Sequence, residues 1–402
     1  MKDVITIGAG MIRFNKYDGA TAPWRTHEQM GREACINALK HAGVNHRDIQ
    51  AAYFGQTASG LIQLGQRVCD WLGISGIPIY NQENACATSL AAFRQAYVDV
   101  AAGMHDLVMV AGVEKMSMVK ARKKSEGGGG GGMGMLGGGG GPIVVPEGVM
   151  FLADLGIIMP AFFALLGTRH MHDYGTTREQ FAQISVKNHR CGAMNPYAQY
   201  QKEVTLEQVL NSRMICDPVT LLQCTPTGDG AACVILASSK VAKKYTTKMV
   251  KVAGSIVMNG QYKAHQGEFA SVASCKVAAK MIFEQTGIGP HDLNVVEQHD
   301  CFTPHELVTY EDLGLCKPGD GPRLLWDGVT DLGGELPINP SGGVISCNPI
   351  GATGLIRCAE AALQIMGRAD RRQVPDAEIA LSSGFGGCWW SDLLMYGARM
   401  PA

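Results

Sequence analysis

Short apolar runs alternate with segments of helical periodicity over the first third of the chain. Four runs predict strands, at 4–7, 49–54, 77–80 and 106–111. The last run, DLVMVA, is continuously apolar, as in a parallel strand that is buried on both faces. Helices are predicted over 26–42, with Gly43 as its cap, and over 87–102. This alternation is typical of layered α/β proteins.

The same order of elements returns in the second half of the chain. A strand, a helix and a strand are predicted at 250–257, 272–285 and 294–298. ALKHAGVNHRDIQAAYF (38–54) and MIFEQTGIGPHDLNVVE (281–297) share one pattern, which places Gly43 opposite Gly287. A second pair follows in the same order, ACATSLAAF at 85–93 and IGATGLIRC at 350–358. The sequence therefore predicts an internal duplication of one βαβα unit.

The alternation breaks between 113 and 223, where we expect an inserted loop domain. Two polyglycine runs within 127–141 predict a loop that is either a tolerated surface insertion or a lid or partner contact. A helix-rich segment follows at 170–190, and a strand at 231–237 completes the first half. The expected domains are an N-terminal half that carries the insertion and a C-terminal half, at 1–248 and 249–402.

The composition limits the classes of partner. With 35 Lys and Arg against 36 Asp and Glu, the formal net charge is −1, so neither nucleic acid nor a membrane surface is an expected partner. The N-terminus does not resemble a signal peptide. The apolar stretch 149–166 is interrupted by Asp154 and Pro160, which favours a buried helix over a membrane span. The 13 cysteines lack zinc spacing and indicate a reduced, cytoplasmic protein.

Cys86, in the stretch NACATSL, follows a predicted strand and opens a predicted helix. A thiol in that place meets free backbone N–H groups and the positive end of the helix dipole, which both favour the thiolate. Its small neighbours would let a substrate come close. Cys86 is therefore a candidate nucleophile, and a buried structural cysteine is the alternative.

Three further stretches could complete a site around this cysteine. HDCFTPHEL holds His299 and Cys301, which would share one side of the chain if strand geometry continued, or would simply pack in the core. Thr303 and Glu306 match a capping box for the helix that follows. NPSGGVISCNPIGATGL (339–355) predicts a tight turn before a helix, and the glycines of LSSGFGG could offer backbone N–H groups to an oxyanion.

Together these motifs resemble those of the thiolase superfamily over nearly the full length. NACATSL is similar to the nucleophile motif, GVEKMS to the strand end that follows it, and NPSGG…GATGL to the motif of the C-terminal half. HDCF resembles the signature of the sterol-carrier-protein-type thiolases, and RHMHDYGTTREQFA and KNHRCGAMNPYAQ resemble the loop domain of that branch. The resemblance implies an α/β fold of two duplicated βαβαβαββ halves in a layered α-β-α-β-α core.

The resemblance also implies roles for individual residues. Cys86 would be the nucleophile that becomes acylated, and Cys301 would be the acid/base. His299 would help to hold the thioester oxygen in one oxyanion hole. The backbone N–H of Cys86 and Gly384 would form the other. Ser382 stands where many thiolases have a second cysteine, in agreement with Cys301 as the acid/base.

The chain departs from the family pattern at Asn348. The family has Gly-His-Pro where this chain has Cys347-Asn348-Pro349. An amide can donate a hydrogen bond to an oxyanion but cannot take up a proton at neutral pH. Thiolate formation would then rest on the helix dipole and on His299. We hypothesise that the usual Asn and His of the second and third motifs have exchanged places here.

The reaction that the resemblance implies is CoA-dependent thiolysis of a 3-oxoacyl-CoA through an acyl-cysteine. Its ligands are acyl-CoA and CoA, without a bound cofactor or metal. A C-acyltransferase and a non-catalytic scaffold subunit are the alternatives. The branch further implies a homodimeric core and a small OB-fold, zinc-ribbon partner. The 20 methionines and Trp389-Trp390 fit a bulky or aromatic acyl chain, as in the benzoylsuccinyl-CoA thiolases, or equally a packed core.

Overall fold

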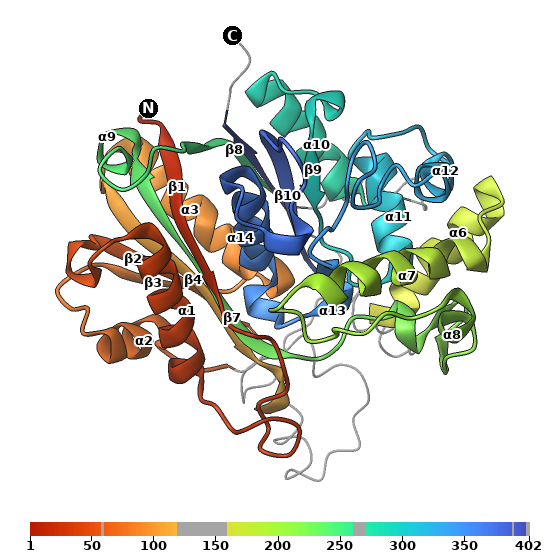
Figure 1. The fold of residues 1–402 in the computed structure, drawn as a ribbon, viewed down its shortest axis with the longest axis horizontal. Coiled ribbons are helices and arrows are strands. Elements are labelled where there is room, and N and C mark those ends of the chain that lie inside the picture. The colour runs from red at the N-terminus through yellow and green to blue at the C-terminus, as the bar shows by residue number, and fades with distance from the viewer. Residues whose placement is uncertain (58–59, 119–158, 260–270, 388–389, 399–402) are drawn as a thin grey trace.

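The first half of the chain alternates strands and helices. The computed structural model describes residues 1–57, 60–118, 159–259, 271–387 and 390–398 (Figure 1). The elements of the first half are β1 (Val4–Met11), α1 (His27–Ala42), β2 (Ala51–Gly55), α2 (Leu64–Leu72), β3 (Ile79–Gln82), α3 (Thr88–Ala102), β4 (Leu107–Lys115), β7 (Asp229–Ser238) and α9 (Ser239–Ala242). The predicted strands and helices are confirmed, with ends shifted by a few residues.

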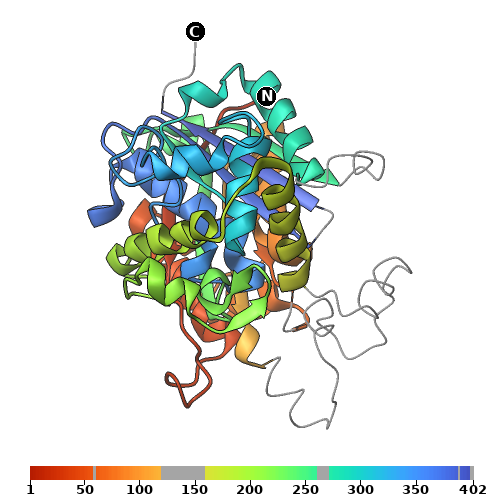
Figure 2. The ribbon, with the colours of Figure 1, turned by 90° about the vertical axis from the view of Figure 1, so that its right-hand side faces the viewer.

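Helices dominate the segment between β4 and β7. It contains α6 (Met159–Tyr174), α7 (Arg178–Met194), α8 (Leu206–Leu210), β5 (Met214–Cys216) and β6 (Val219–Thr220). Figures 1 and 2 show α6 and α7 lying over the second half of the chain, where α7 contacts the helices of that half. The polyglycine runs at 127–141 lie outside the described residues. Of the helices that are described, none is long and apolar enough to cross a bilayer.

The second half repeats the order of the first. Its elements are β8 (Val250–Asn259), α10 (Ala273–Thr286), β9 (Val295–Glu297), α11 (Thr303–Asp312), α12 (Gly321–Trp326), α13 (Gly343–Ser346), α14 (Thr353–Met366), β10 (Ile379–Gly386) and β11 (Trp390–Gly397). The third strand of the repeat is reduced to one parallel bridge, between Val296 and Ile338. The chain turns directly afterwards at Asn339, whose φ is 54°, so no longer strand forms there.

One mixed sheet of nine strands passes through both halves, in the order β3-β2-β4-β7-β1-β8-β11-β10-β9. Two residue pairs, Ile5 with Lys251 and Thr6 with Val250, join β1 to β8, so each half contributes its own half-sheet. Helices α3 and α14 pack together between the half-sheets, α1 and α2 cover one outer face, and α10 and α11 cover the other (Figure 1). The predicted α-β-α-β-α layering is confirmed.

Matching turns confirm the duplication. Gly43 ends α1 with φ 68°, and Gly287 ends α10 with φ 69°, the left-handed conformation that glycine adopts at low cost. Each is followed by a short 3₁₀ turn, His46–Asp48 and Pro290–Asp292. Close packing of helix on sheet also depends on glycine, because a Cβ on Gly10 would lie 2.2 Å from the backbone of α1.

Candidate active site

Cys86 lies in a 3₁₀ turn, η2 (Ala85–Ala87), between the end of β3 and the start of α3. Ala85 has φ 48°, an unusual conformation for a residue with a Cβ. The hydroxyl of Thr88 stabilises the turn, because it donates to the Ala85 carbonyl at 2.6 Å and accepts from the Asn84 N–H at 2.6 Å. The turn thereby holds Cys86, a partly exposed residue, at the first turn of a helix.

The surroundings of Cys86 do not favour the thiolate in the way that the sequence predicted. The side chain packs against Met116 and Ile350. Burial raises the pKa of the thiol to about 12, and the Glu114 carboxylate contributes to the rise. The backbone N–H groups of Gly387 and of Cys86 itself lower the pKa of this thiol, but by less. The expectation that the helix terminus would secure a thiolate is therefore wrong for the chain alone.

The mirror turn of the second half, η7 (Ile350–Ala352), lies directly against the Cys86 turn. Gly351 occupies the position that corresponds to Cys86. Its N–H donates to Glu114 Oε2 at 3.2 Å, and the Thr57 N–H donates to the same oxygen at 3.0 Å. The buried carboxylate of β4 therefore binds the mirror turn beside the candidate nucleophile.

Asn348 lies two residues before the mirror turn and is buried. Its Oδ1 accepts a hydrogen bond from the Thr353 hydroxyl at 2.9 Å. Because the oxygen is engaged by the first residue of α14, the Nδ2 amide is the group of this side chain that can donate to a ligand.

Gly384 lies within β10 and not after it. A Cβ on Gly384 would be 3.2 Å from Leu90 Cδ2 and 3.5 Å from the Ala87 Cα, so the strand packs closely against the start of α3 and touches the Cys86 turn. The Ser383 hydroxyl accepts a hydrogen bond from the His299 N–H at 2.9 Å. Ser382 instead contacts Cys358 of α14 at 3.6 Å, in the core. Strand β10 therefore touches both the Cys86 turn and the HDCF segment.

His299 and Cys301 lie in a loop, since β9 ends at Glu297. Strand geometry, the condition for aligning their side chains, does not continue to these residues. Both are buried, and neither ring nitrogen of His299 has a hydrogen-bond partner among the described residues. Burial lowers the pKa of His299 well below its ordinary value, and His305 and Arg357 contribute to this. The ring is therefore neutral, with one N–H donor and one acceptor nitrogen.

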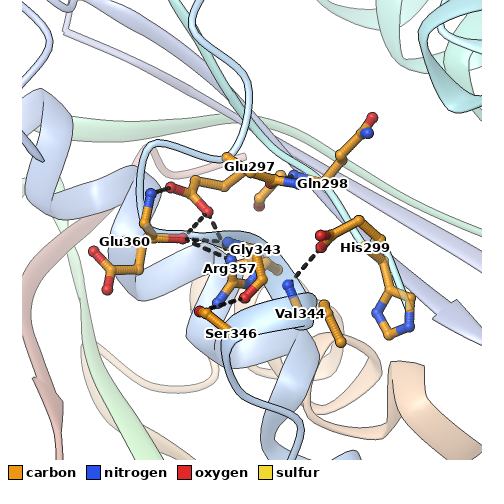
Figure 3. Close-up of polar contacts among 12 residues, drawn as sticks. Glu297, Gln298, His299, Gly343, Val344, Ser346, Arg357 and Glu360 are labelled. Carbon is orange, nitrogen blue, oxygen red and sulfur yellow. Dashed lines mark hydrogen bonds and ion pairs between the residues drawn. The ribbon is translucent and has the colours of Figure 1, made fainter. Parts of the chain in front are cut away.

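Two carboxylates of this segment hold the NPSGG turn in place. Glu297 accepts the Arg357 guanidinium at 2.8 Å and the Ser341 N–H at 3.0 Å. Asp300 accepts the Val344 N–H at 2.5 Å at the start of α13. A Cβ on Gly343, whose φ is 64°, would lie 2.3 Å from the Asp300 carboxylate, so glycine is required there. Figure 3 shows the His299 ring directed away from the Glu297–Arg357 pair.

The predicted capping box at Thr303 and Glu306 is wrong. Phe302 is the N-cap residue of α11, and its side chain makes no capping hydrogen bond. The Glu306 carboxylate is buried and accepts Lys187 Nζ of α7 at 2.5 Å and the Tyr310 hydroxyl at 2.5 Å. Lys187 of α7 and Tyr310, one turn along α11, therefore bind the carboxylate that a local cap would use, and Lys187 joins the inserted helix α7 to the HDCF segment.

His305 was not predicted from the sequence. Its Nδ1 lies 3.5 Å from the Cys301 Sγ, and the centre of its ring is 5.9 Å from that of His299. The i, i+4 spacing of cysteine and histidine in HDCFTPH is the signal that could have indicated it. Gly387, whose N–H acts on the Cys86 thiol, was missed as well.

The expected residues thus form two groups, and β10 contacts both. Cys86, Asn348 and Gly384 lie around the paired turns, and His299 and Cys301 lie around His305. Within the part of the chain that the structure describes, no cluster of three or more His, Cys, Asp or Glu could hold a metal ion. The arrangement offers a thiol with backbone N–H donors, a second thiol paired with an imidazole, and a neutral imidazole without a protein partner.

Known proteins resemble the chain over nearly its whole length. It is 36% identical to acetyl-CoA acetyltransferase of Methanothermobacter thermautotrophicus, over 96% of this chain and 97% of that protein. It is 37% identical to sterol carrier protein 2 of Oryctolagus cuniculus, over 95% of this chain and 70% of that protein. It is 33% identical to benzoylsuccinyl-CoA thiolase subunit BbsB of Thauera aromatica, over 96% of this chain and 95% of that protein.

Solved structures have the same fold. The Ltp2-ChsH2(DUF35) aldolase superposes with a TM-score of 0.83 at 24% identity, over 99% of this chain and 98% of that one. Human mitochondrial 3-ketoacyl-CoA thiolase in complex with CoA superposes with a TM-score of 0.71 at 18% identity, over 98% of both chains. Two family models match, the thiolase N-terminal domain over residues 4–240 and the thiolase C-terminal domain-like family over 257–395. The chain therefore belongs to the thiolase family of acyltransferases.

Proposed function

We propose that this protein catalyses the CoA-dependent thiolytic cleavage of a 3-oxoacyl-CoA, with the acyl group carried on Cys86. The observation that carries the proposal is the place of Cys86, a partly exposed residue, at the start of α3, where the Gly387 N–H acts on its thiol. The duplicated turn has Gly351 in the same place, so one half alone offers a nucleophile. The names of the relatives, an acetyltransferase and a thiolase, support this reaction class.

The reaction has two half-reactions that share the nucleophile. Cys86 attacks the C3 carbonyl as a thiolate, the C2–C3 bond breaks, and the Cys301 thiol protonates C2 of the departing acyl-CoA. The Cys301 thiolate then takes the proton of a CoA thiol, whose sulfur attacks the acyl carbon and releases Cys86. Ping-pong kinetics are expected. The position of Ser382 in the core, against Cys358, supports Cys301 as the acid/base.

The polar groups around the thiols have complementary roles in this proposal. Burial raises the pKa of Cys86 and lowers that of His299, so His299 is not proposed as the base for this thiol, and the backbone N–H groups of Gly387 and Cys86 are the groups that favour its thiolate. The N–H of the neutral His299 ring, whose nitrogens have no partner among the described residues, and the Asn348 Nδ2 donate to one developing oxyanion. The backbone N–H groups of Cys86 and Gly384 serve the other oxyanion.

Replacing Asn348 by alanine is expected to lower turnover by about 10²–10³-fold, since the loss of one oxyanion donor has an effect of this size. The measurement is kcat for 3-oxoacyl-CoA cleavage, with Asn45→Ala as the control. Asn45 is exposed and caps a 3₁₀ turn. Turnover of Asn348→Ala equal to that of the wild type would remove Asn348 from the oxyanion site.

The proposal is tested by incubating the protein with a 3-oxoacyl-CoA, with and without free CoA. Loss of the 3-oxoacyl-CoA and formation of two acyl-CoA products, only when free CoA is present, is the expected result. Acyl transfer to another acceptor without thiolysis would identify a C-acyltransferase instead. A protein that forms no product and whose Cys86 resists iodoacetamide would be a scaffold subunit.

The acyl chain that we propose is bulky or aromatic. The rings of Phe163 and Phe385 both lie 4.7 Å from that of His305, and Phe302 stacks on Phe163 at 5.1 Å. These rings are buried around His305, and the support for an aromatic acyl chain comes from the name of one relative, benzoylsuccinyl-CoA thiolase subunit BbsB. Trp389 lies outside the described residues. The series of 3-oxoacyl-CoA substrates in the assay should therefore include aromatic members, and a preference for acetoacetyl-CoA over all of them would contradict this proposal.

We also propose that a second copy pairs with the edge strand β3, and that a small OB-fold, zinc-ribbon protein completes the assembly in the cytoplasm. Strand β3 lies at one edge of the sheet, and Tyr80 on it is exposed and stacks on Tyr53. The names of a subunit and of a two-component aldolase among the similar proteins favour a partner. None of the twelve described cysteines forms a disulfide, which suits a reducing compartment.

Native mass spectrometry tests this assembly. It is expected to report twice the 42.9 kDa chain mass, and a further mass after co-expression with a small zinc-ribbon protein. A single chain mass under both conditions would contradict the proposal.

A further inference from the structure

The imidazole of His305 lies beside the Cys301 thiol in the first turn of α11. The distance between Cys301 Sγ and His305 Nδ1 is 3.5 Å, within hydrogen-bonding range for sulfur. The carbonyl of His305 accepts a hydrogen bond from the Thr309 hydroxyl at 2.8 Å, one turn further along the helix. The helix therefore fixes the backbone from which the ring reaches the thiol.

Aromatic rings enclose this imidazole. Phe163 of α6 and Phe385 of β10 each lie 4.7 Å from it, measured between ring centres, and His305 is 2% exposed. Burial lowers the pKa of His305 to about 3. The ring is therefore neutral and cannot form a stable thiolate–imidazolium pair with Cys301 by taking its proton.

A neutral imidazole has one N–H, and the chemistry of Cys301 indicates where it must be. If the thiol hydrogen were donated to Nδ1, it would not be directed at the substrate. If Nδ1 carries the hydrogen, His305 donates to the sulfur, and the thiol hydrogen stays available for C2 of the substrate.

We propose that His305 is a positioning residue for Cys301. Its Nδ1–H donates a hydrogen bond to the Cys301 sulfur and stabilises the thiolate that forms when C2 is protonated. The proposal rests on the thiolase reaction proposed above. As the C2–C3 bond breaks, its electron pair goes to C2, the Cys301 S–H bond breaks, and the proton joins C2. The sulfur then carries the negative charge, with the Nδ1–H bond in place, until the CoA thiol gives it a proton.

The test compares two rates in three variants. His305→Phe keeps a ring but has no donor, and His305→Asn keeps an N–H near the position of Nδ1. The control His189→Phe removes another buried histidine, whose Nδ1 lies 3.2 Å from the Ser185 hydroxyl. The rates are deuterium uptake at C2 of acetyl-CoA in D₂O and acylation of Cys86 by acetyl-CoA, followed by intact mass.

Deuterium uptake in His305→Phe is expected to fall about 10- to 100-fold, the effect of one hydrogen bond to a charged group. Acylation is expected to change little, because a CoA thiolate leaves more readily than a carbanion and needs the proton of Cys301 less. His305→Asn is expected to show a deuterium uptake between those of His305→Phe and the wild type. The control His189→Phe is expected to show the wild-type uptake. Wild-type uptake in His305→Phe, or an equal loss of both rates that His305→Asn does not restore, would overturn the proposal.

Alkylation of Cys301 by iodoacetamide, followed by peptide mass mapping, gives a measurement that needs no turnover. His305→Phe is expected to slow this alkylation about 10- to 100-fold at fixed pH, since the thiolate loses its donor. An unchanged rate would reject the role of His305. Failure of the wild type to acylate or exchange would reject the thiolase reaction, while the alkylation rates still decide whether His305 acts on Cys301.

Discussion

Replacing Cys86 by serine is expected to lower 3-oxoacyl-CoA thiolysis by about 10⁴-fold or more, the scale seen when a covalent nucleophile is removed. A serine hydroxyl at the same position lacks the acidity and the nucleophilicity of a thiol. The same burial and the nearby Glu114 that raise the pKa of Cys86 would oppose ionisation of the serine hydroxyl, which is less acidic than a thiol, and so add to the loss of activity in Cys86→Ser. The measurement is steady-state thiolysis together with intact mass after exposure to acyl-CoA.

The control for this variant is Cys316→Ser. Cys316 is partly exposed like Cys86, but it lies after α11, away from the paired turns. Thiolysis in Cys316→Ser should stay near the wild-type rate. Substantial thiolysis by Cys86→Ser, or acylation of that variant at another cysteine, would show that the nucleophile has been misassigned.

Replacing Cys301 by alanine is expected to lower thiolysis by about 10²–10⁴-fold, the usual contribution of one general acid/base. The loss should be concentrated in the step at C2, because the carbanion needs a proton and Cys301 is the group proposed to supply it. Acylation of Cys86 by a simple acyl-CoA should be less affected. Cleavage and acylation are therefore measured separately, by product formation and by intact mass.

Cys275→Ala is a matched control, since Cys275 is buried on α10 in the same apolar cluster as Cys301. It should lose some stability but keep the ratio of cleavage to acylation. If Cys301→Ala kept the wild-type cleavage rate, the acid/base would have to be another residue, and the mechanism proposed for the HDCF segment would be wrong.

Local sequence patterns predicted the fold well, because they depend on short-range physics. Gly43 ends α1 in the left-handed conformation, as the pattern over 26–42 indicated, and Thr26 caps the helix in a capping box with Gln29 that was not predicted. The same helix-end pattern at Gly287 indicated the duplication. Contacts between residues far apart in the sequence could not be predicted from local patterns. The Glu306 carboxylate binds Lys187 of α7, far away in the sequence, and Tyr310, one turn along α11, and does not form the local cap.

The membership of the candidate site stays a prediction, while the surroundings of Cys86 differ from those that the sequence indicated. Cys86 is at a strand-to-helix turn, as expected, and Gly384 packs against that turn. The expected thiolate failed because a sequence shows the helix dipole but not the burial by Met116 and Ile350 or the nearby Glu114. His305 was missed because its reach back to Cys301 depends on where α11 begins, and that boundary was mispredicted with the cap.

The central claim, that Cys86 carries the acyl group, is tested most directly by mass spectrometry of the intact protein after incubation with short, branched and aromatic acyl-CoA thioesters. The predicted result is a mass increase equal to one acyl group, mapped to the peptide that contains Cys86 and lost again when free CoA is added. No adduct with any of these thioesters, or an adduct on a different residue, would contradict the claim.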